Sequence, residues 1–171
     1  NNNAYCQDNE IAWYDWETAD PMLLGITKYL IGIRNEHPVF RRRRWFEGRR
    51  VHGAGVRDIG WYNTDGAPMS DDDWNRGYAR SLTVFLNGKA LPTPGPRGET
   101  VEDDSFLILF NAHTKPVTFT VPEDLDGFQW QVVLDTSREM TCADLVGAAD
   151  AWPVEGWSVV LLQQINGDTS S

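Results

Sequence analysis

The amino-acid sequence predicts a mainly β protein, an antiparallel β-sandwich with Greek-key connections that is preceded by a loop and one α-helix. Residues 21–36 carry apolar side chains at helical spacing, between a start signal and a stop signal. From residue 39 onward, at least six short apolar or alternating runs are separated by turn residues, which is typical of a sandwich. The length of 171 residues allows one domain with a real core plus one extra element.

The first seventeen residues, NNNAYCQDNEIAWYDWE, combine amides, carboxylates and aromatic rings without helical or strand periodicity. Such a segment is typical of a ligand-facing loop, because amides and carboxylates fix the orientation of a ligand while aromatic faces supply contact area. The alternative is a surface loop with two aromatic anchors, and composition by itself favours that alternative.

The helix is predicted to begin after Asp20, whose carboxylate suits the N-cap, with Pro21 at the first helical position. It is predicted to end at His37, because a residue that precedes a proline avoids the α region. Four residues form one apolar stripe that we expect to be buried against another element: Leu23, Ile26, Leu30 and Ile33.

Residues 39–46 are predicted to be extended and contain four consecutive arginines, 41–44. Alternate arginines of an extended segment point to opposite faces, so we expect carboxylate or carbonyl partners on both sides. A nucleic-acid patch is disfavoured because the chain has a net charge of −10 and no accompanying binding motif. We therefore expect structural ion pairing at a domain junction.

The remaining predicted strands are residues 58–62, 81–87, 106–110, 117–121, 130–134 and 157–162. Of these, 106–110 and 117–121 are expected to pair as a hairpin. Residues 48–55 and 91–98 are predicted loops, and the proline-rich second one is the expected place for disorder. A turn is predicted at 63–66, and 70–74 is predicted to be a turn or a helix N-terminus rather than a calcium loop.

Composition excludes several classes of function. The sequence contains no apolar run of eighteen residues, so we expect no membrane span. Its first residues show no basic n-region or apolar h-region, so we expect no signal peptide. Cys6 and Cys142 show no paired spacing, and both one disulfide and a reduced pair remain open. No zinc-type spacing of ligands is present, and we predict no metal or other cofactor. The eight tryptophans suit either a sandwich core or sugar contacts, and the core is the favoured interpretation.

The opening run resembles the segment that follows the eighth barrel strand in bacterial glycogen-debranching enzymes, the isoamylase-like branch of the α-amylase superfamily. The similarity continues through residues 34–44, 58–61, 69–74 and 133–136, so it covers nearly the whole chain. The resemblance implies that residues 1–38 are the last loop and helix of an incomplete (β/α)₈ catalytic barrel, that 39–165 are a C-terminal β-sandwich and that 166–171 are a tail.

The resemblance also implies a function: the C-terminal portion of a cytoplasmic enzyme that hydrolyses α-1,6 branch linkages of glycogen or limit dextrin. The catalytic carboxylates of that family lie upstream, and no residue of this chain matches them, so the chain alone is expected to be inactive. Asn3, Tyr5, Gln7 and Asp8 are expected to line or buttress the glucan cleft, and the alternative is that they only brace the loop. The partners implied are branched α-glucan and the missing barrel. A non-catalytic glucan-binding module is the second interpretation.

Overall fold

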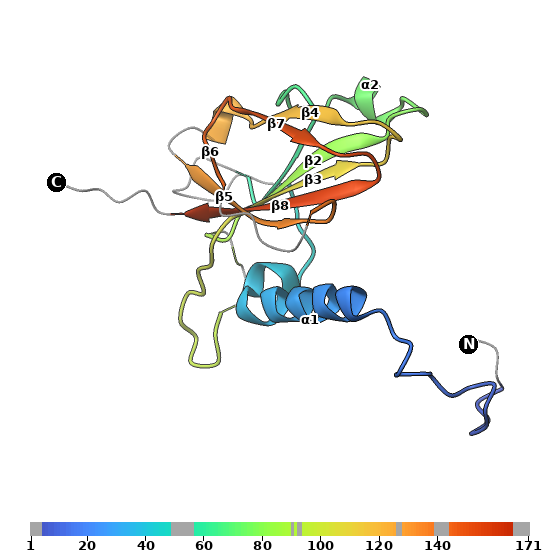
Figure 1. The fold of residues 1–171 in the computed structure, drawn as a ribbon. Coiled ribbons are helices and arrows are strands. Elements are labelled where there is room, and N and C mark those ends of the chain that lie inside the picture. The colour runs from blue at the N-terminus through green and yellow to red at the C-terminus, as the bar shows by residue number, and fades with distance from the viewer. Residues whose placement is uncertain are drawn as a thin grey trace.

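The computed structural model describes residues 5–48, 57–89, 91, 94–125, 128–138 and 144–165. In this part of the chain, one long helix, α1 (Pro21–Glu36), lies beside a β-sandwich, and residues 5–20 extend away from both (Figure 1). A short 3₁₀ helix, η1 (Pro38–Arg41), follows α1 directly. A second short helix, α2 (Asp71–Trp74), and the 3₁₀ turn η2 (Glu123–Leu125) lie between strands. The mainly β fold predicted from the sequence is confirmed.

The larger sheet contains six antiparallel strands in the order β1-β2-β3-β8-β5-β6. Their bounds are β1 (Ile59–Tyr62), β2 (Ser81–Leu86), β3 (Phe106–Asn111), β5 (Gln129–Asp135), β6 (Leu145–Val146) and β8 (Ser158–Ile165). The smaller sheet pairs β4 (Val117–Thr120) with β7 (Ala151–Val154), also antiparallel. Non-consecutive neighbours such as β3 and β8 show the long-range connections that were expected of a Greek key.

The main core lies between the two sheets. Because successive side chains of a strand point to opposite faces, Phe85, Leu107 and Leu109 point into this core from the large sheet. Phe119 and Val154 meet them from the small sheet, and both are fully buried. The same alternation sends the other side chains of these strands to the opposite face of the large sheet.

A second core lies on the opposite face of the large sheet. Phe106, Leu86 and Leu161 point to that side and pack with Val39 of η1. Tyr29 and Ile33 of α1 are half-buried against the same cluster. The helix therefore covers one end of this face, which is the packing that its amphipathic sequence requires.

Helix α1 has the limits that the sequence predicts. Asp20 accepts hydrogen bonds from the backbone N–H groups of Met22 and Leu23, and Pro21 is the first helical residue. The apolar stripe is only partly buried, which corrects the expectation: Ile26 and Ile33 are half-buried, whereas Leu23 and Leu30 are exposed. The helix packs on the second core through Tyr29 and Ile33, so its buried face includes Tyr29 and only part of the predicted stripe.

An irregularity in β5 provides a hydrogen-bond acceptor for α1. The register of β5 against β8 shifts between Val132 and Leu134, which takes Val133 out of the regular ladder. The carbonyl of Val133 accepts a hydrogen bond of 2.8 Å from the hydroxyl of Tyr29. An irregularity of the sheet thus provides the acceptor for the helix.

One predicted strand and one predicted strand pairing are wrong. Residues 39–46 contain a 3₁₀ turn followed by irregular chain rather than a strand, because Pro38 starts a helical turn and Val39 is drawn into the second core. Residues 117–120 form β4, which pairs with β7 and not with β3. β3 has no free edge for a hairpin, since β2 and β8 flank it on both sides.

Other predictions are confirmed by particular elements. The strands predicted at 58–62, 81–87, 106–110, 130–134 and 157–162 correspond to β1, β2, β3, β5 and β8. Residues 70–74 form a helix N-terminus capped by Ser70. The two strands that the prediction missed are β6, which has two residues, and β7, which contains a proline. Both features weaken a strand signal.

The tryptophans contradict the predicted core role. Trp130 is fully buried and Trp152 is half-buried, but the other six are exposed: Trp13, Trp16, Trp45, Trp61, Trp74 and Trp157. Cys6 is exposed and carries a free thiol. Predictions for Asn3, Cys142, residues 49–56 and 166–171 lie outside the described residues. None of the described helices has the length and apolar character needed to cross a bilayer.

Candidate functional site

The structure describes three of the four predicted site residues, namely Tyr5, Gln7 and Asp8. All three lie in the opening segment and are exposed. The indole Nε1 of Trp13 donates to Oδ1 of Asp8 at 2.5 Å. The amide of Asn9 donates to Oε1 of Gln7 at 3.2 Å. The side chain of Tyr5 is 83% exposed. Gln7 and Asp8 are therefore ordered by their own segment, and Tyr5 presents an uncovered ring; their contact with a glucan stays a prediction.

Next to this segment, α1 presents apolar side chains that nothing in the described chain covers. No residue of the helix is fully buried. Met22, Leu23 and Ile31 are all more than half exposed. Exposed apolar side chains of this kind indicate an interaction surface.

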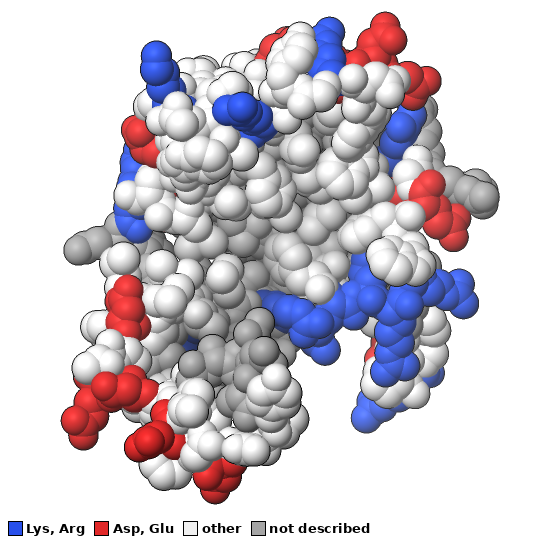
Figure 2. Space-filling view, turned by 90° about the vertical axis from the view of Figure 1, so that its right-hand side faces the viewer, with Lys and Arg blue, Asp and Glu red and all other residues white. Residues whose placement is uncertain are grey.

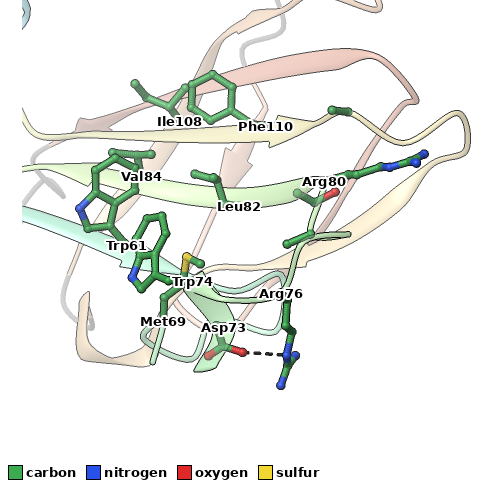
Figure 3. Close-up of a pocket in the computed structure, with 13 residues that line it drawn as sticks. Trp61, Met69, Asp73, Trp74, Arg76, Arg80, Leu82, Val84, Ile108 and Phe110 are labelled. Carbon is green, nitrogen blue, oxygen red and sulfur yellow. Dashed lines mark ion pairs between the residues drawn. The ribbon is translucent and has the colours of Figure 1, made fainter. Parts of the chain in front are cut away.

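The large sheet carries a second uncovered apolar surface. An apolar groove of about 710 Å³ lies on the face of the sheet that also carries α1. Its floor is formed by Leu82 and Val84 of β2 with Ile108 and Phe110 of β3 (Figure 3). Figure 2 shows a side of the molecule whose middle is made of uncharged residues, with the largest group of Lys and Arg below and to the right of it. The second core thus covers only part of this sheet face.

Two exposed tryptophans stand at the side of the groove. Trp61 comes from β1 and Trp74 from α2, and their rings meet edge to face at 5.3 Å (Figure 3). They also line a second, more polar cleft of about 480 Å³. Side chains of both charges and one phenol reach this cleft, namely Arg57, Asp71, Asp124 and Tyr62. The Trp61–Trp74 pair therefore separates an apolar groove from a polar cleft.

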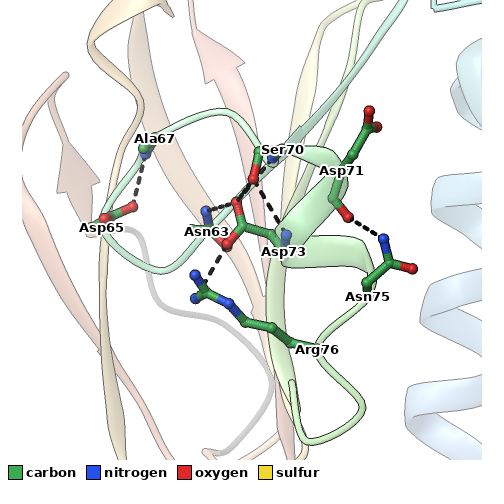
Figure 4. Close-up of polar contacts among 8 residues, drawn as sticks. All are labelled: Asn63, Asp65, Ala67, Ser70, Asp71, Asp73, Asn75 and Arg76. Atoms are coloured by element: carbon green, nitrogen blue, oxygen red, sulfur yellow. Dashed lines mark hydrogen bonds and ion pairs between the residues drawn. The ribbon is translucent and has the colours of Figure 1, made fainter.

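Asp73 holds α2, and with it Trp74, in place (Figure 4). Its Oδ2 accepts from the backbone N–H of Ser70 at 2.9 Å, the Ser70 hydroxyl at 2.7 Å and the Asn63 amide at 3.0 Å. Arg76 forms an ion pair of 3.2 Å with the other oxygen. The hydrogen bonds from the Ser70 backbone and hydroxyl, then that from Asn63, lower the pKa of Asp73 to about 2. Asp73 is thus a structural anion and not a proton donor near neutral pH.

His37, Asp103 and Asp104 are the described residues whose ligand atoms lie close enough together to hold a metal ion, within 4.8 Å of one another. These atoms already have hydrogen-bond partners. Asp103 accepts from His37 Nδ1 at 2.7 Å and from the Val39 N–H at 2.9 Å. Asp104 accepts from Gln163 Nε2 at 2.7 Å. The cluster acts as a clasp between η1 and the sandwich.

The arginine run makes one of the ion pairs that were expected of it. Arg42 is largely buried and lies 3.4 Å from Oδ2 of Asp58. Its guanidinium also stacks over the ring of Phe46 at 3.9 Å. The other three arginines of the run are exposed, because the chain is not extended and does not send alternate side chains into a seam.

Sequence reasoning missed the Trp61–Trp74 pair. Residues 58–61 and 69–74 belong to the runs that carry the resemblance, and the exposed side of β1 follows from strand alternation once Tyr62 is placed in the core. What the sequence lacked was the position of α2 beside β1. Only that position brings the two rings together.

Comparisons with known proteins agree with this architecture. A family model described as "Isoamylase, C-terminal" matches residues 58–163, from just before β1 into β8. A "Glycogen operon protein GlgX homolog" from Mycobacterium tuberculosis is 45% identical over 168 residues, which cover 96% of this chain and 23% of the relative. A "Glycogen debranching enzyme" from Serratia proteamaculans is 30% identical over 162 residues, 95% of this chain and 20% of the relative.

A further "Glycogen debranching enzyme", from Cronobacter sakazakii, is 41% identical over 102 residues, 60% of this chain and 14% of the relative. The chain spans less than a quarter of the length of these curated relatives. The resemblance read from the sequence is confirmed, and because the family model covers most of the sandwich, the chain belongs to the isoamylase C-terminal family.

Proposed function

We propose that this chain is the C-terminal portion of a glycogen-debranching enzyme that hydrolyses α-1,6 branch linkages of glycogen or limit dextrin. Family membership and the names of the relatives support this proposal. In it, residues 1–38 complete a catalytic barrel and residues 39–165 form the sandwich beside it. The cytoplasmic location implied by the family resemblance is part of the same proposal.

The observation that carries the proposal is that two apolar surfaces are uncovered, one on α1 and one in the groove of the large sheet. Leu23 and Ile31 on the helix and Phe110 on the sheet are exposed although they lie beside packed apolar clusters. Removing such side chains from water is favourable by roughly 25 cal/mol per Å² of apolar surface. A preceding domain that covered these surfaces would be stabilised by them, so the sandwich serves as scaffold for that domain.

The chemistry is assigned to the preceding domain. Glycoside hydrolysis ordinarily needs two carboxyl groups that flank the scissile bond, one protonated and one ionised. The buried carboxylates described above have other tasks, since Asp73 caps α2, Asp58 pairs with Arg42 and Asp103 clasps η1. We therefore expect no turnover by this chain alone.

In the intact enzyme, the loop before α1 is proposed to border the glucan cleft. Tyr5 supplies an exposed ring, and Gln7 and Asp8 supply acceptors that are fixed by neighbours. Loops at the C-terminal ends of barrel strands surround the active site of such enzymes. Asn3 belongs to the same proposal on the sequence alone.

The experiment uses the intact protein and the chain alone with glycogen limit dextrin as substrate. We expect release of α-1,6-linked branches by the intact protein and none by the chain. Tyr5→Ala and Asp8→Asn in the intact protein should lower kcat/KM, whereas Glu17→Gln, which also changes an exposed residue of the segment, should not. If Tyr5→Ala and Asp8→Asn fold normally and their kinetics are unchanged, the loop only braces the barrel and does not contact the substrate. Hydrolysis by the chain alone would overturn the assignment of the chemistry.

A non-catalytic glucan-binding module is the second candidate, and the exposed Trp61–Trp74 pair favours it. Flat aromatic rings stack on the apolar faces of sugars. Affinity electrophoresis in gels with and without glycogen separates the two readings for the isolated chain. Retardation together with an absence of α-1,6 hydrolysis by the intact protein would favour the module.

A further inference from the structure

We propose that the polar cleft beside Trp61 and Trp74 is a second, non-catalytic binding site for an α-glucan chain, which holds the polysaccharide on the sandwich. This inference rests on the proposed function for the class of ligand. The site lies on β1, α2 and η2, away from the opening loop that is proposed to border the catalytic cleft. It adds a residue-level binding site that the family assignment does not provide.

The aromatic side of the cleft is suited to sugar rings. The side chains of Trp61 and Trp74 are 39% and 52% exposed, although each contacts the other ring. A glucose unit presents C–H groups on its faces, and such groups pack against an indole without requiring a charge on the ligand. A neutral polymer also suits a chain of net charge −10, which would repel a polyanion.

The polar side of the cleft provides hydrogen-bonding groups that sugar hydroxyls need. Asp71 and Asp124 supply carboxylates, and Arg57 supplies a guanidinium. The Tyr62 hydroxyl donates to Oδ2 of Asp124 at 3.1 Å, so this carboxylate is held at the wall of the cleft. Burial and the Asp124 charge raise the pKa of Tyr62, which keeps its hydroxyl a donor. Charged acceptors beside an aromatic wall form the usual chemistry of carbohydrate recognition.

The neighbouring groove serves as an internal comparison. Its floor of Leu82, Val84, Ile108 and Phe110 offers few hydrogen-bonding groups, and such a surface suits a protein domain. The cleft on the other side of the same tryptophans mixes carboxylates, a guanidinium and a phenol with the rings. The two hollows therefore suit different occupants, and the glucan belongs in the polar one.

Hydrogen bonds within the protein hold the aromatic side of the cleft in place before a ligand binds. Asp73 ties Ser70 and Asn63 to α2, which sets the position of Trp74 relative to β1. A preformed aromatic wall avoids the entropic cost of ordering side chains on binding. The site can therefore bind glucan without a conformational change of the sheet.

The test measures retardation of the intact protein in glycogen gels and its dissociation constant for maltoheptaose. We expect Trp74→Ala to weaken both by about ten-fold, the loss typical of an aromatic anchor. Asp71→Asn, an exposed and less disruptive change, should weaken them by about three-fold. Trp45→Ala is the matched control, because Trp45 is 93% exposed and lies outside the cleft.

Hydrolysis of a small branched oligosaccharide, measured in parallel, keeps the two proposals apart. The Trp74→Ala variant should keep its kcat on that substrate. Equal retardation of the wild type, Trp74→Ala and Asp71→Asn would overturn the site even if the protein debranches glycogen. An equal loss in Trp45→Ala would also overturn it. Absence of α-1,6 hydrolysis with Trp74-dependent binding would instead overturn the proposed function and leave the site standing.

Discussion

The imidazole Nδ1 of His37 lies 2.7 Å from Oδ1 of Asp103, which joins the C-terminal end of α1 to the loop before β3. Because a carboxylate only accepts, His37 donates this bond. The second oxygen of Asp103 accepts from the N–H of Val39, the residue that enters the second core. A single carboxylate therefore connects the helix, η1 and the sandwich.

Replacing Asp103 with alanine should lower the free energy of unfolding by about 1–3 kcal/mol, because donors on His37 and Val39 lose their buried partner. Urea denaturation of the wild type and the variant measures the change. Glu102→Ala is the control, since it removes a neighbouring exposed carboxylate. Equal losses in the two variants would show that the clasp contributes nothing specific.

A small substitution at Asn111, at the end of β3, should destabilise the protein more than the replacement of Asp103 does. Its buried amide donates to the carbonyls of Val154 and Glu155 at 3.0 and 2.9 Å, which ties the large sheet to β7. Asn111→Asp places a carboxylate against these carbonyls and should lower the midpoint of thermal unfolding strongly, with a cost of at least about 3 kcal/mol. Asn35→Asp, at an exposed asparagine, is the control for the charge change. A variant with unchanged unfolding would mean that Asn111 does not hold the sheets together.

The lowered pKa of Asp73 should make the free energy of unfolding depend on pH. Its pKa is lowered to about 2 by the Ser70 backbone N–H and hydroxyl and then by Asn63, whereas the usual value is 3.8. A carboxyl with a depressed folded-state pKa stabilises the fold above its unfolded pKa and loses that effect as the pH falls through the folded value. The stability difference between the wild type and Asp73→Asn should therefore be constant near neutral pH and shrink between about 4 and about 2.

Carbon-detected NMR titration of the Asp73 carboxyl would measure the midpoint directly. Asp72→Asn, from the same short helix, controls for the loss of one charge. A midpoint near 3.8, or a stability difference that does not change below pH 4, would contradict the assigned hydrogen bonds.

The two faces of β3 should respond differently to truncation. Leu107→Ala opens a cavity in the main core and should cost about 2–5 kcal/mol in any context. Phe110→Ala removes a partly exposed groove residue and should cost less in the isolated chain. If the preceding domain covers the groove, Phe110→Ala should become more costly in the intact protein. Thermal unfolding of both variants in both contexts measures this, and an unchanged cost for Phe110→Ala would place the docked domain elsewhere.

Local sequence signals predicted the elements that depend on few neighbours. Asp20, Pro21 and Pro38 set the limits of α1, and alternation placed Phe119 in the core. The same signals failed where distant residues compete. Residues 117–121 have a strand pattern with either partner, and only the occupied edges of β3 exclude the hairpin.

Of the two candidate sites, one could be proposed from the sequence and the other could not. The opening loop was identified from its composition and its resemblance, since both are properties of a continuous run of residues. The Trp61–Trp74 pair was not, because exposure of a tryptophan depends on which sheet face remains uncovered. Counting tryptophans favoured the core, and the structure places most of them outside it.

The sequence by itself determined the family, through the runs that resemble known members. It also determined the sandwich class and the helix limits, because capping, periodicity and turn chemistry act over a few neighbouring residues. The tertiary structure alone decided which partner each strand takes, which face of α1 is buried and which rings meet at the surface. Those outcomes depend on contacts between residues far apart in the chain, such as Tyr29 with Val133, and no local pattern encodes such a distance.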